Sequence, residues 1–214
     1  MSVGQFYFDQ IELKAREIGD LFQDPSHDFL HIQRVVKNAI VLQKSEGGDL
    51  NIILPAAYLH DFLVIKKDDP RRKQASLLSA NAAIDFLKSI HYPDQYLTSI
   101  HHAIHAHSFS AQVKTQTIEA EIVQDADRLD ALGAIGIARC FTTAGKLNRI
   151  FYDAEDPSAN QRELNDQINT IDHFELKLNH IAEQMNTSYA KQIAQQRVNL
   201  QMTYLKHFFS ELGN

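Results

Sequence analysis

Apolar side chains recur at helical spacing along almost the whole chain of 214 residues, which limits the possible folds more than any other feature. In the stretch FLHIQRVVKNAIVL, for example, Ile32, Val35, Val36 and Ala39 belong to one side of a helix. No run alternates apolar and polar residues for long enough to make a convincing strand. The sequence therefore predicts an all-α protein with helices at about 5–22, 26–46, 51–65, 74–90, 94–107, 117–142, 169–185 and 188–212.

Local signals mark several ends and connections of these helices. Ser26 is the expected N-cap of the second helix, and Gly47-Gly48 is expected to end it. A loop containing YDAEDPSANQREL is predicted between about 144 and 168. Gly133 and Gly136 in LGAIGIA do not indicate dinucleotide binding, because no strand precedes them and G-x-G-x-x-G is absent. We expect these glycines to allow close helix packing.

The composition narrows the class of protein. Hydrophobic residues make up 44% of the chain, enough for the core of one domain. No apolar run approaches the length that crosses a bilayer, and MSVGQFYFDQ lacks the layout of a signal peptide, so we expect a cytoplasmic protein without a membrane partner. The single cysteine, Cys140, excludes an intramolecular disulfide and is expected to be a core residue. A net charge of −6 argues against a nucleic-acid partner, and the sequence is compatible with a homodimer.

Polar side chains that are hard to bury stand inside these apolar patterns. His60 and Asp61 lie within AAYLHDFLVIKK, and burying an aspartate without a partner costs several kcal/mol. His31 lies one turn before Val35 on the second predicted helix. Asp127 lies beside the inner stripe of the helix predicted at 117–142. Three predicted helices therefore each direct an imidazole or a carboxylate towards one interior.

A divalent metal ion would resolve this burial problem, because it neutralises the carboxylates and binds the imidazole lone pairs. Nitrogen and oxygen ligands without thiolate suit Mn, Fe, Ni, Co or Mg better than a structural zinc site. Four protein ligands on a six-coordinate metal leave positions for water and substrate, as in a hydrolytic site. Taken singly, each histidine is more simply a core residue, and Asp127 a partner of the adjacent Arg128. For the ordered set we favour the metal.

The order H…HD…D, together with SHDFLHIQRV, LHDF, HSFS and QDADRLDALGAIGIAR, resembles the HD-domain superfamily of metal-dependent phosphohydrolases, in particular its YedJ/YpgQ-like bacterial branch. The resemblance extends from about residue 20 to about 205. It implies a single HD-type domain over 1–214, with a core at about 20–140 and C-terminal helices at about 169–212 packing on it. The metal ligands that it implies are His31, His60, Asp61 and Asp127.

Three better-known activities of the superfamily are disfavoured by the residues after the His-Asp doublet. Nucleotidases and alarmone hydrolases that resemble this chain carry an acid in HDxxE or HDxxED, where this sequence has Val64 and Ile65. Phosphodiesterases of cyclic dinucleotides carry HDxGK, where it has Leu63 and Val64. All three activities are therefore in doubt for this chain.

Other side chains are candidates for catalysis. Besides Asp61, we expect His102 or His107 to assist the leaving group and Asp130 to orient water. His101 and His105 are weaker candidates. The alternatives are a solvated, histidine-rich helix end and, for Asp130, a salt bridge on the helix surface.

Phosphate recognition requires positive charge that the chain as a whole lacks. Arg34 and Lys66 are the preferred candidates for this contact. His27, on the same helix face as His31, and Arg128, next to Asp127, are further candidates for substrate binding. Lys67, Arg71, Arg72 and Lys73 are expected to be surface residues, partly neutralised by Asp68 and Asp69.

The prediction is a cytoplasmic phosphohydrolase that uses one divalent metal ion, such as manganese, on a small phosphorylated substrate. The family resemblance implies a nucleotide, and within that class we favour cleavage of a (d)NTP to monophosphate and pyrophosphate. Three alternatives remain: a phosphomonoesterase acting on another substrate, a nucleotide- or metal-binding sensor without turnover, and a helical interaction protein.

Overall fold

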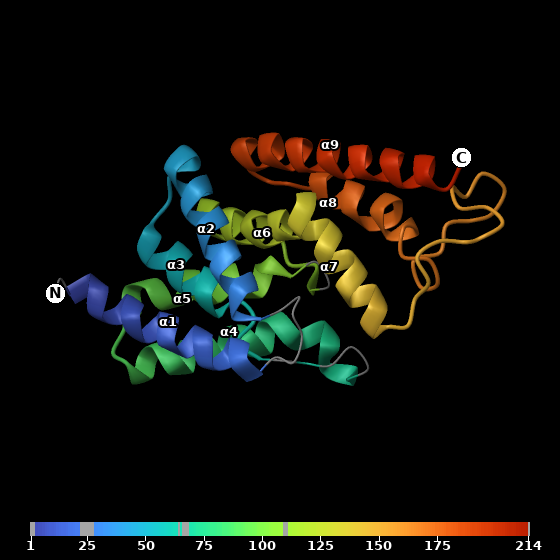
Figure 1. The fold of residues 1–214 in the computed structure, drawn as a ribbon. Helices are drawn as coiled ribbons and strands as arrows, with labels where there is room; N and C mark the ends of the chain where they lie inside the picture. Colours follow the sequence, from blue (N-terminus) through green and yellow to red (C-terminus); the bar gives the residue numbers. More distant parts are fainter. Residues whose placement is uncertain (1–2, 22–27, 64, 66–68, 109–110, 214) are drawn as a thin grey trace. The chain divides into compact units, whose positions relative to one another are not determined.

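The computed structural model describes residues 3–21, 28–63, 65, 69–108 and 111–213, and these residues contain helices and no strand (Figure 1). The all-α prediction is confirmed. One isolated parallel bridge joins Ile150 to Asn169. The helical segments are α1 (Val3–Leu21), α2 (Phe29–Glu46), α3 (Leu50–Leu59), η1 (Pro70–Gln74), α4 (Ala75–Ser89), α5 (Asp94–His107), α6 (Ile118–Asp130), α7 (Gly133–Lys146), the π-helical η3 (Phe174–Leu178), α8 (Asn179–Glu183) and α9 (Ser188–Glu211).

The chain divides into two compact units, residues 1–127 and 128–214. In the first unit, α3 packs against both α2 and α5, and α4 packs against α5. Its interior is filled by aliphatic side chains that are almost fully buried: Ile32, Leu42, Ile53, Leu59, Leu87, Ile100, Ile104 and Ile122. This burial is the main source of stability for helices that would be marginal in isolation.

In the second unit, α7 packs against α9, and aromatic side chains form much of the contact. The Phe141 ring lies 6.1 Å from the Tyr204 ring and 6.3 Å from the fully buried Phe174 ring. The connection between α7 and η3 is held by an ion pair, in which Arg162 donates to both carboxylate oxygens of Asp172 at 2.5 and 2.8 Å. Two hydrogen bonds in a fork fix geometry as well as charge.

The start of α2 differs from the prediction. The helix begins at Phe29, and its N-cap is Asp28, whose carboxylate accepts a hydrogen bond from the His31 backbone N–H at 2.9 Å. The predicted N-cap, Ser26, lies outside the described residues. At the other end, Gly47 has a φ of 85° and its N–H donates to the Gln43 carbonyl, so the predicted glycine stop is confirmed.

The helix predicted at 51–65 is shorter than expected. α3 ends at Leu59, and His60 and Asp61 lie in the turn that follows. Apolar residues continue beyond that point, which made the helix look longer than it is. The last helices also differ in part, because helical structure was expected from 169 whereas η3 begins at Phe174. Residues just before it hold backbone hydrogen bonds to the opposite segment, from Thr170 and Ile171 to the carbonyls of Ile150 and Phe151.

The single long helix predicted at 117–142 is wrong. The structure has α6 and α7 in its place, separated by Ala131 and Leu132. Gly133 has a φ of 72°, a left-handed conformation that favours glycine. A Cβ on Gly136 would lie 2.1 Å from the Ala131 carbonyl oxygen. These glycines therefore permit a tight turn between two helices. The prediction that they allow close helix packing is also confirmed, because a Cβ on Gly133 would meet Arg197 of α9 at 3.1 Å and one on Gly136 would meet Gln201 of α9 at 3.1 Å.

Candidate metal site

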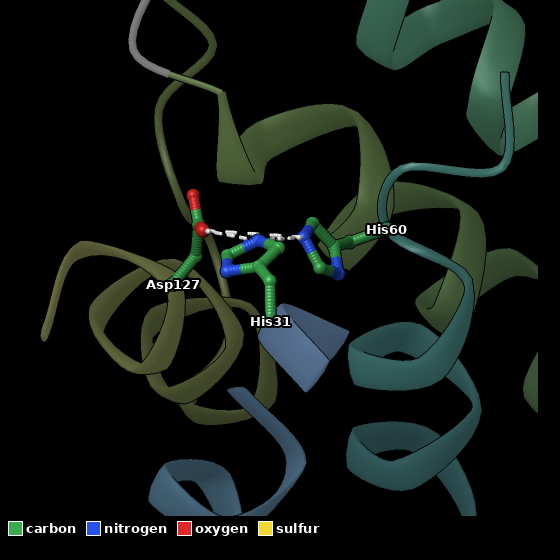
Figure 2. Close-up of side chains that lie close together, drawn as sticks. All are labelled: His31, His60 and Asp127. Carbon is green, nitrogen blue, oxygen red and sulfur yellow. Dashed lines mark hydrogen bonds and ion pairs between the residues drawn. The ribbon is translucent and has the colours of Figure 1, made fainter. Parts of the chain in front are cut away.

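Three elements of the first unit bring His31, His60 and Asp127 to one point (Figure 2). His31 lies in the first turn of α2, His60 directly after α3, and Asp127 near the end of α6. The Nε2 atoms of His31 and His60 are 3.3 Å apart. The Oδ1 atom of Asp127 lies 3.5 Å from Nε2 of His31 and 3.9 Å from Nε2 of His60. Three potential ligand atoms, 29 to 96 residues apart in sequence, thus converge in space.

The histidines and the aspartates of the site differ in exposure. The His31 and His60 side chains are 1% and 0% exposed, whereas those of Asp61 and Asp127 are 30% and 29% exposed. The two imidazoles therefore form the buried part of the site, and the two carboxylates form its solvent-exposed part. A cation entering from that side would meet carboxylates before reaching the imidazole nitrogens.

The ring of His60 is fixed by a backbone carbonyl. Its Nδ1 lies 2.9 Å from the Ala57 carbonyl oxygen, which can only accept, so Nδ1 carries the proton. In the neutral ring, the lone pair is then on Nε2, the atom that faces His31 and Asp127. Metal-binding histidines typically donate their second N–H to a carbonyl or carboxylate in this way. The local fold therefore presents His60 in the tautomer that a metal ion requires.

A second group shares His60 with the first and contains Asp61 and His107. Asp61 Oδ2 lies 3.6 Å from Nε2 of His60, and Asp61 Oδ1 lies 3.7 Å from Nε2 of His107. Burial alone would lower the pKa of His107, but the Asp61 and Asp127 carboxylates outweigh it and raise that pKa. Of the predicted ligands, the structure thus groups His31 and Asp127 with His60, and it groups Asp61 and His107 with the same histidine.

These separations fit a bound divalent cation. Ligand atoms placed about 2.1 Å from a metal lie roughly 3.0 Å apart at right angles and roughly 3.4 Å apart at tetrahedral angles. Five pairs of donor atoms within the two groups lie 3.3 to 3.9 Å apart, close to the separations that a bound ion imposes. Imidazole nitrogens and carboxylate oxygens without thiolate suit Mn, Fe, Co or Ni. The residues present therefore fit the metal that the sequence predicts.

The other histidines of α5 make different contacts. His102 Nε2 accepts a hydrogen bond from the Gln116 backbone N–H at 3.1 Å, and His101 Nε2 lies 2.9 Å from Asn81 Oδ1. The pKa values of His101 and His105 are lowered by burial and by neighbouring histidines. Of the histidines on α5, the structure brings His107 into the candidate metal groups.

The remaining predicted residues lie in varied surroundings. Asp130 is 2% exposed and accepts a hydrogen bond from Arg139 at 2.6 Å, and Arg128 donates to the Gln184 carbonyl at 2.6 Å. Arg34 lies on α2 with a half-buried side chain, three residues after His31. The predicted substrate-binding residues His27 and Lys66, and also Lys67, lie outside the described residues.

The cations after the His-Asp doublet are engaged locally. Arg71 pairs with Asp69 at 2.8 Å, and Arg72 donates to the Ile65 carbonyl at 3.0 Å. Both arginine residues are exposed, as the sequence predicted. The backbone groups that orient the site were missed, since the carbonyls of Ala57 and Ile104 leave no signal in the sequence. Asp28 itself was a usable sequence signal, because aspartate is a preferred N-cap residue.

The HD domain family model matches residues 29–132, which contain every residue of both candidate metal groups. YpgQ of Bacillus subtilis (strain 168) is 30% identical over 194 residues, covering 89% of this chain and 86% of YpgQ. The chain therefore belongs to the HD-domain superfamily, a class of metal-dependent phosphohydrolases, and the family predicted from the sequence motifs is confirmed.

Solved structures share the fold over almost the whole chain. Bacillus subtilis YpgQ in complex with ADP has a TM-score of 0.76 and 29% identity, over 97% of this chain and 95% of that one. An HD-superfamily hydrolase from Bacillus thuringiensis has a TM-score of 0.75 and 32% identity, over 98% of each chain. Among the described residues of this protein, no helix has the length and apolar character needed to cross a bilayer.

Proposed function

We propose that this protein is a metal-dependent nucleotide pyrophosphohydrolase, which cleaves a (d)NTP to the monophosphate and pyrophosphate. The observation that carries the proposal is the convergence of His31, His60 and Asp127, with donor atoms 3.3 to 3.9 Å apart. This cluster lies in a chain of the HD-superfamily hydrolase class. The chemistry proposed is therefore hydrolysis at phosphorus.

A nucleotide substrate is supported by a relative. The YpgQ structure with ADP is similar to this chain over nearly its whole length, and ADP contains an adenine nucleoside joined to a phosphoanhydride. The bond choice is supported by the sequence after the doublet, where Val64 and Ile65 stand in place of the acid of HDxxE or HDxxED enzymes. Cleavage of an α–β anhydride is therefore proposed in preference to monoester hydrolysis.

The charges of the site indicate why a cation is required. Asp61 and Asp127 border the exposed side of the cluster, and two carboxylates there would repel a polyphosphate. A divalent cation bound at the cluster supplies Lewis-acid polarisation of a phosphoryl oxygen and activates water as a nucleophile. His31 and His60 would bind this cation through their Nε2 atoms, from the buried part of the site. Arg34 and Lys66 remain the predicted phosphate contacts, with His27 and Arg128 as further candidates.

The products are fixed by the position of attack. Attack of water on the α-phosphorus places the water oxygen on the nucleoside monophosphate. The bond from the α-phosphorus to the bridging oxygen breaks, and that oxygen leaves on pyrophosphate. Attack on the β-phosphorus would instead place the water oxygen on pyrophosphate.

The test is to incubate the protein with Mn²⁺ and a panel of ribo- and deoxynucleoside triphosphates in ¹⁸O-labelled water. Products are separated by ion-pair chromatography and the label is located by mass spectrometry. We expect monophosphate and pyrophosphate, with the label on the monophosphate, and loss of turnover in Asp127→Ala. The matched control is Asp85→Ala, which removes an exposed acid on α4 and should retain activity.

Other products would overturn parts of the proposal. Release of nucleoside with triphosphate, or of inorganic phosphate, would exclude cleavage between the α- and β-phosphates. Bound nucleotide that stays intact for hours in the presence of Mn²⁺ would exclude the enzyme and favour a sensor. Equal activity in Asp127→Ala and the wild type would exclude the cluster as the site of reaction.

A further inference from the structure

His107 is held in the same manner as His60, although it comes from a different helix. Its Nδ1 lies 2.6 Å from the carbonyl oxygen of Ile104, three residues earlier, just as Nδ1 of His60 lies 2.9 Å from that of Ala57. The two rings stand 5.0 Å apart at an interplanar angle of 82°. His107 is also buried, with 6% exposure. Both rings are thus oriented by the backbone so that Nε2 faces the cluster.

This orientation commits Nδ1 of His107 as a donor and leaves the lone pair of the neutral ring on Nε2. That lone pair faces Oδ1 of Asp61 at 3.7 Å. A nitrogen lone pair and a carboxylate oxygen repel each other unless a proton or a metal cation lies between them, and the raised pKa of His107 reflects this need for positive charge. A cation bound by both atoms turns this unfavourable contact into a stabilising one.

The two candidate groups describe one cation and not two. His60 belongs to both, and since its Nδ1 proton is donated to Ala57, it has a single lone pair to offer. One lone pair on Nε2 binds one ion. Asp61 links the groups further, because its two oxygens face different imidazoles, Oδ2 towards His60 and Oδ1 towards His107.

We propose that His107 is a fifth protein ligand of the cation, beside His31, His60, Asp61 and Asp127. The inference rests on the proposed function only in that it concerns the same metal site. It assigns His107 a role different from the one predicted from the sequence. With Nδ1 donating to Ile104 and Nε2 binding the cation, His107 has no proton to give to a leaving group.

The direct test is a crystal of the wild-type protein soaked in Mn²⁺, with the ion located by its anomalous scattering. We expect a peak within about 2.3 Å of Nε2 of His107 as well as of the His31 and His60 nitrogens. This measurement needs no variant and no activity. A peak bound by His31, His60 and Asp127 with Nε2 of His107 beyond about 3 Å would overturn the inference and leave the proposed function standing.

Calorimetric titration with Mn²⁺ tests the same point in solution. His107→Ala should bind Mn²⁺ at least about tenfold more weakly than the wild type. His105→Ala, a change on the same helix, is the matched control and should bind as the wild type does. Unaltered affinity in His107→Ala, with circular dichroism showing the native helix content, would refute the inference. A wild-type protein that binds no Mn²⁺ would refute both this inference and the proposed function.

Discussion

Replacement of Gly136 by alanine is expected to destabilise the turn that follows the helix carrying Asp127. The new Cβ would lie 2.1 Å from the carbonyl oxygen of Ala131 and 2.5 Å from its carbonyl carbon. Cβ atoms essentially never approach other heavy atoms more closely than 3.0 Å. The obstacle is backbone, which cannot rotate away as a flexible side chain does, so the turn itself must move.

The expected cost follows from the size of this movement. Relieving the contact requires a shift of roughly 1 Å, and backbone shifts of this kind cost about 1–3 kcal/mol or more. For a protein of this size, each kcal/mol lowers Tm by roughly 2–4 °C. Gly136→Ala should therefore lower Tm by about 2–12 °C in a calorimetric scan without added metal.

Gly145 on the same helix provides the control. A Cβ added there meets nothing within 4 Å, and the position is exposed. Alanine in a helix is favoured over glycine by about 0.5–1 kcal/mol, so Gly145→Ala should leave Tm unchanged or raise it slightly. If Gly136→Ala were as stable as the wild type, or if both variants lost the same stability, the close approach of Ala131 to Gly136 would be refuted.

Three further predictions concern the metal, acid stability and the thiol. At 100 times its Kd, Mn²⁺ should stabilise the protein by about 2.7 kcal/mol, which is measured as a rise in Tm that EDTA reverses. Asp127→Ala should show no such rise, and an equal rise in this variant would refute Asp127 as a ligand of the metal. Burial would raise the pKa of Asp166, but hydrogen bonds from Lys177 and His173 outweigh it and lower that pKa. The resulting stability is present above pH about 4 and is lost as pH falls further, so Lys177→Met should be less stable to urea at pH 7 and show a smaller loss at pH 3. Burial raises the pKa of Cys140 to about 12, so a disulfide reagent at pH 8 should modify it slowly in the native protein and rapidly in urea.

Several helices could be predicted closely from the sequence. α5 (Asp94–His107) has the bounds expected from its apolar spacing, and α9 (Ser188–Glu211) differs by one residue at its end. Helix formation depends mainly on neighbours three and four residues apart, which a sequence displays directly. The same local information predicted helix beyond Leu59, because the apolar run continues into the turn that holds His60 and Asp61.

The break between α6 and α7 depended on information of another kind. Ala131 and Leu132 interrupt a stretch with continuous helical spacing, and Gly133 adopts a left-handed φ there. A glycine in a sequence permits such a conformation without requiring it. The contact between Gly136 and the Ala131 carbonyl exists only once the turn has formed.

The sequence by itself determined the helical class, the family and the identity of the polar residues that an apolar interior could not hold without a partner. Only the tertiary structure decided how these residues meet. It placed His31 and Asp127 around His60, brought Asp61 and His107 to the same histidine, and left His102 hydrogen-bonded to Gln116. Periodicity records contacts within one helix, whereas the direction of an imidazole lone pair depends on backbone carbonyls and on packing between helices distant in the chain.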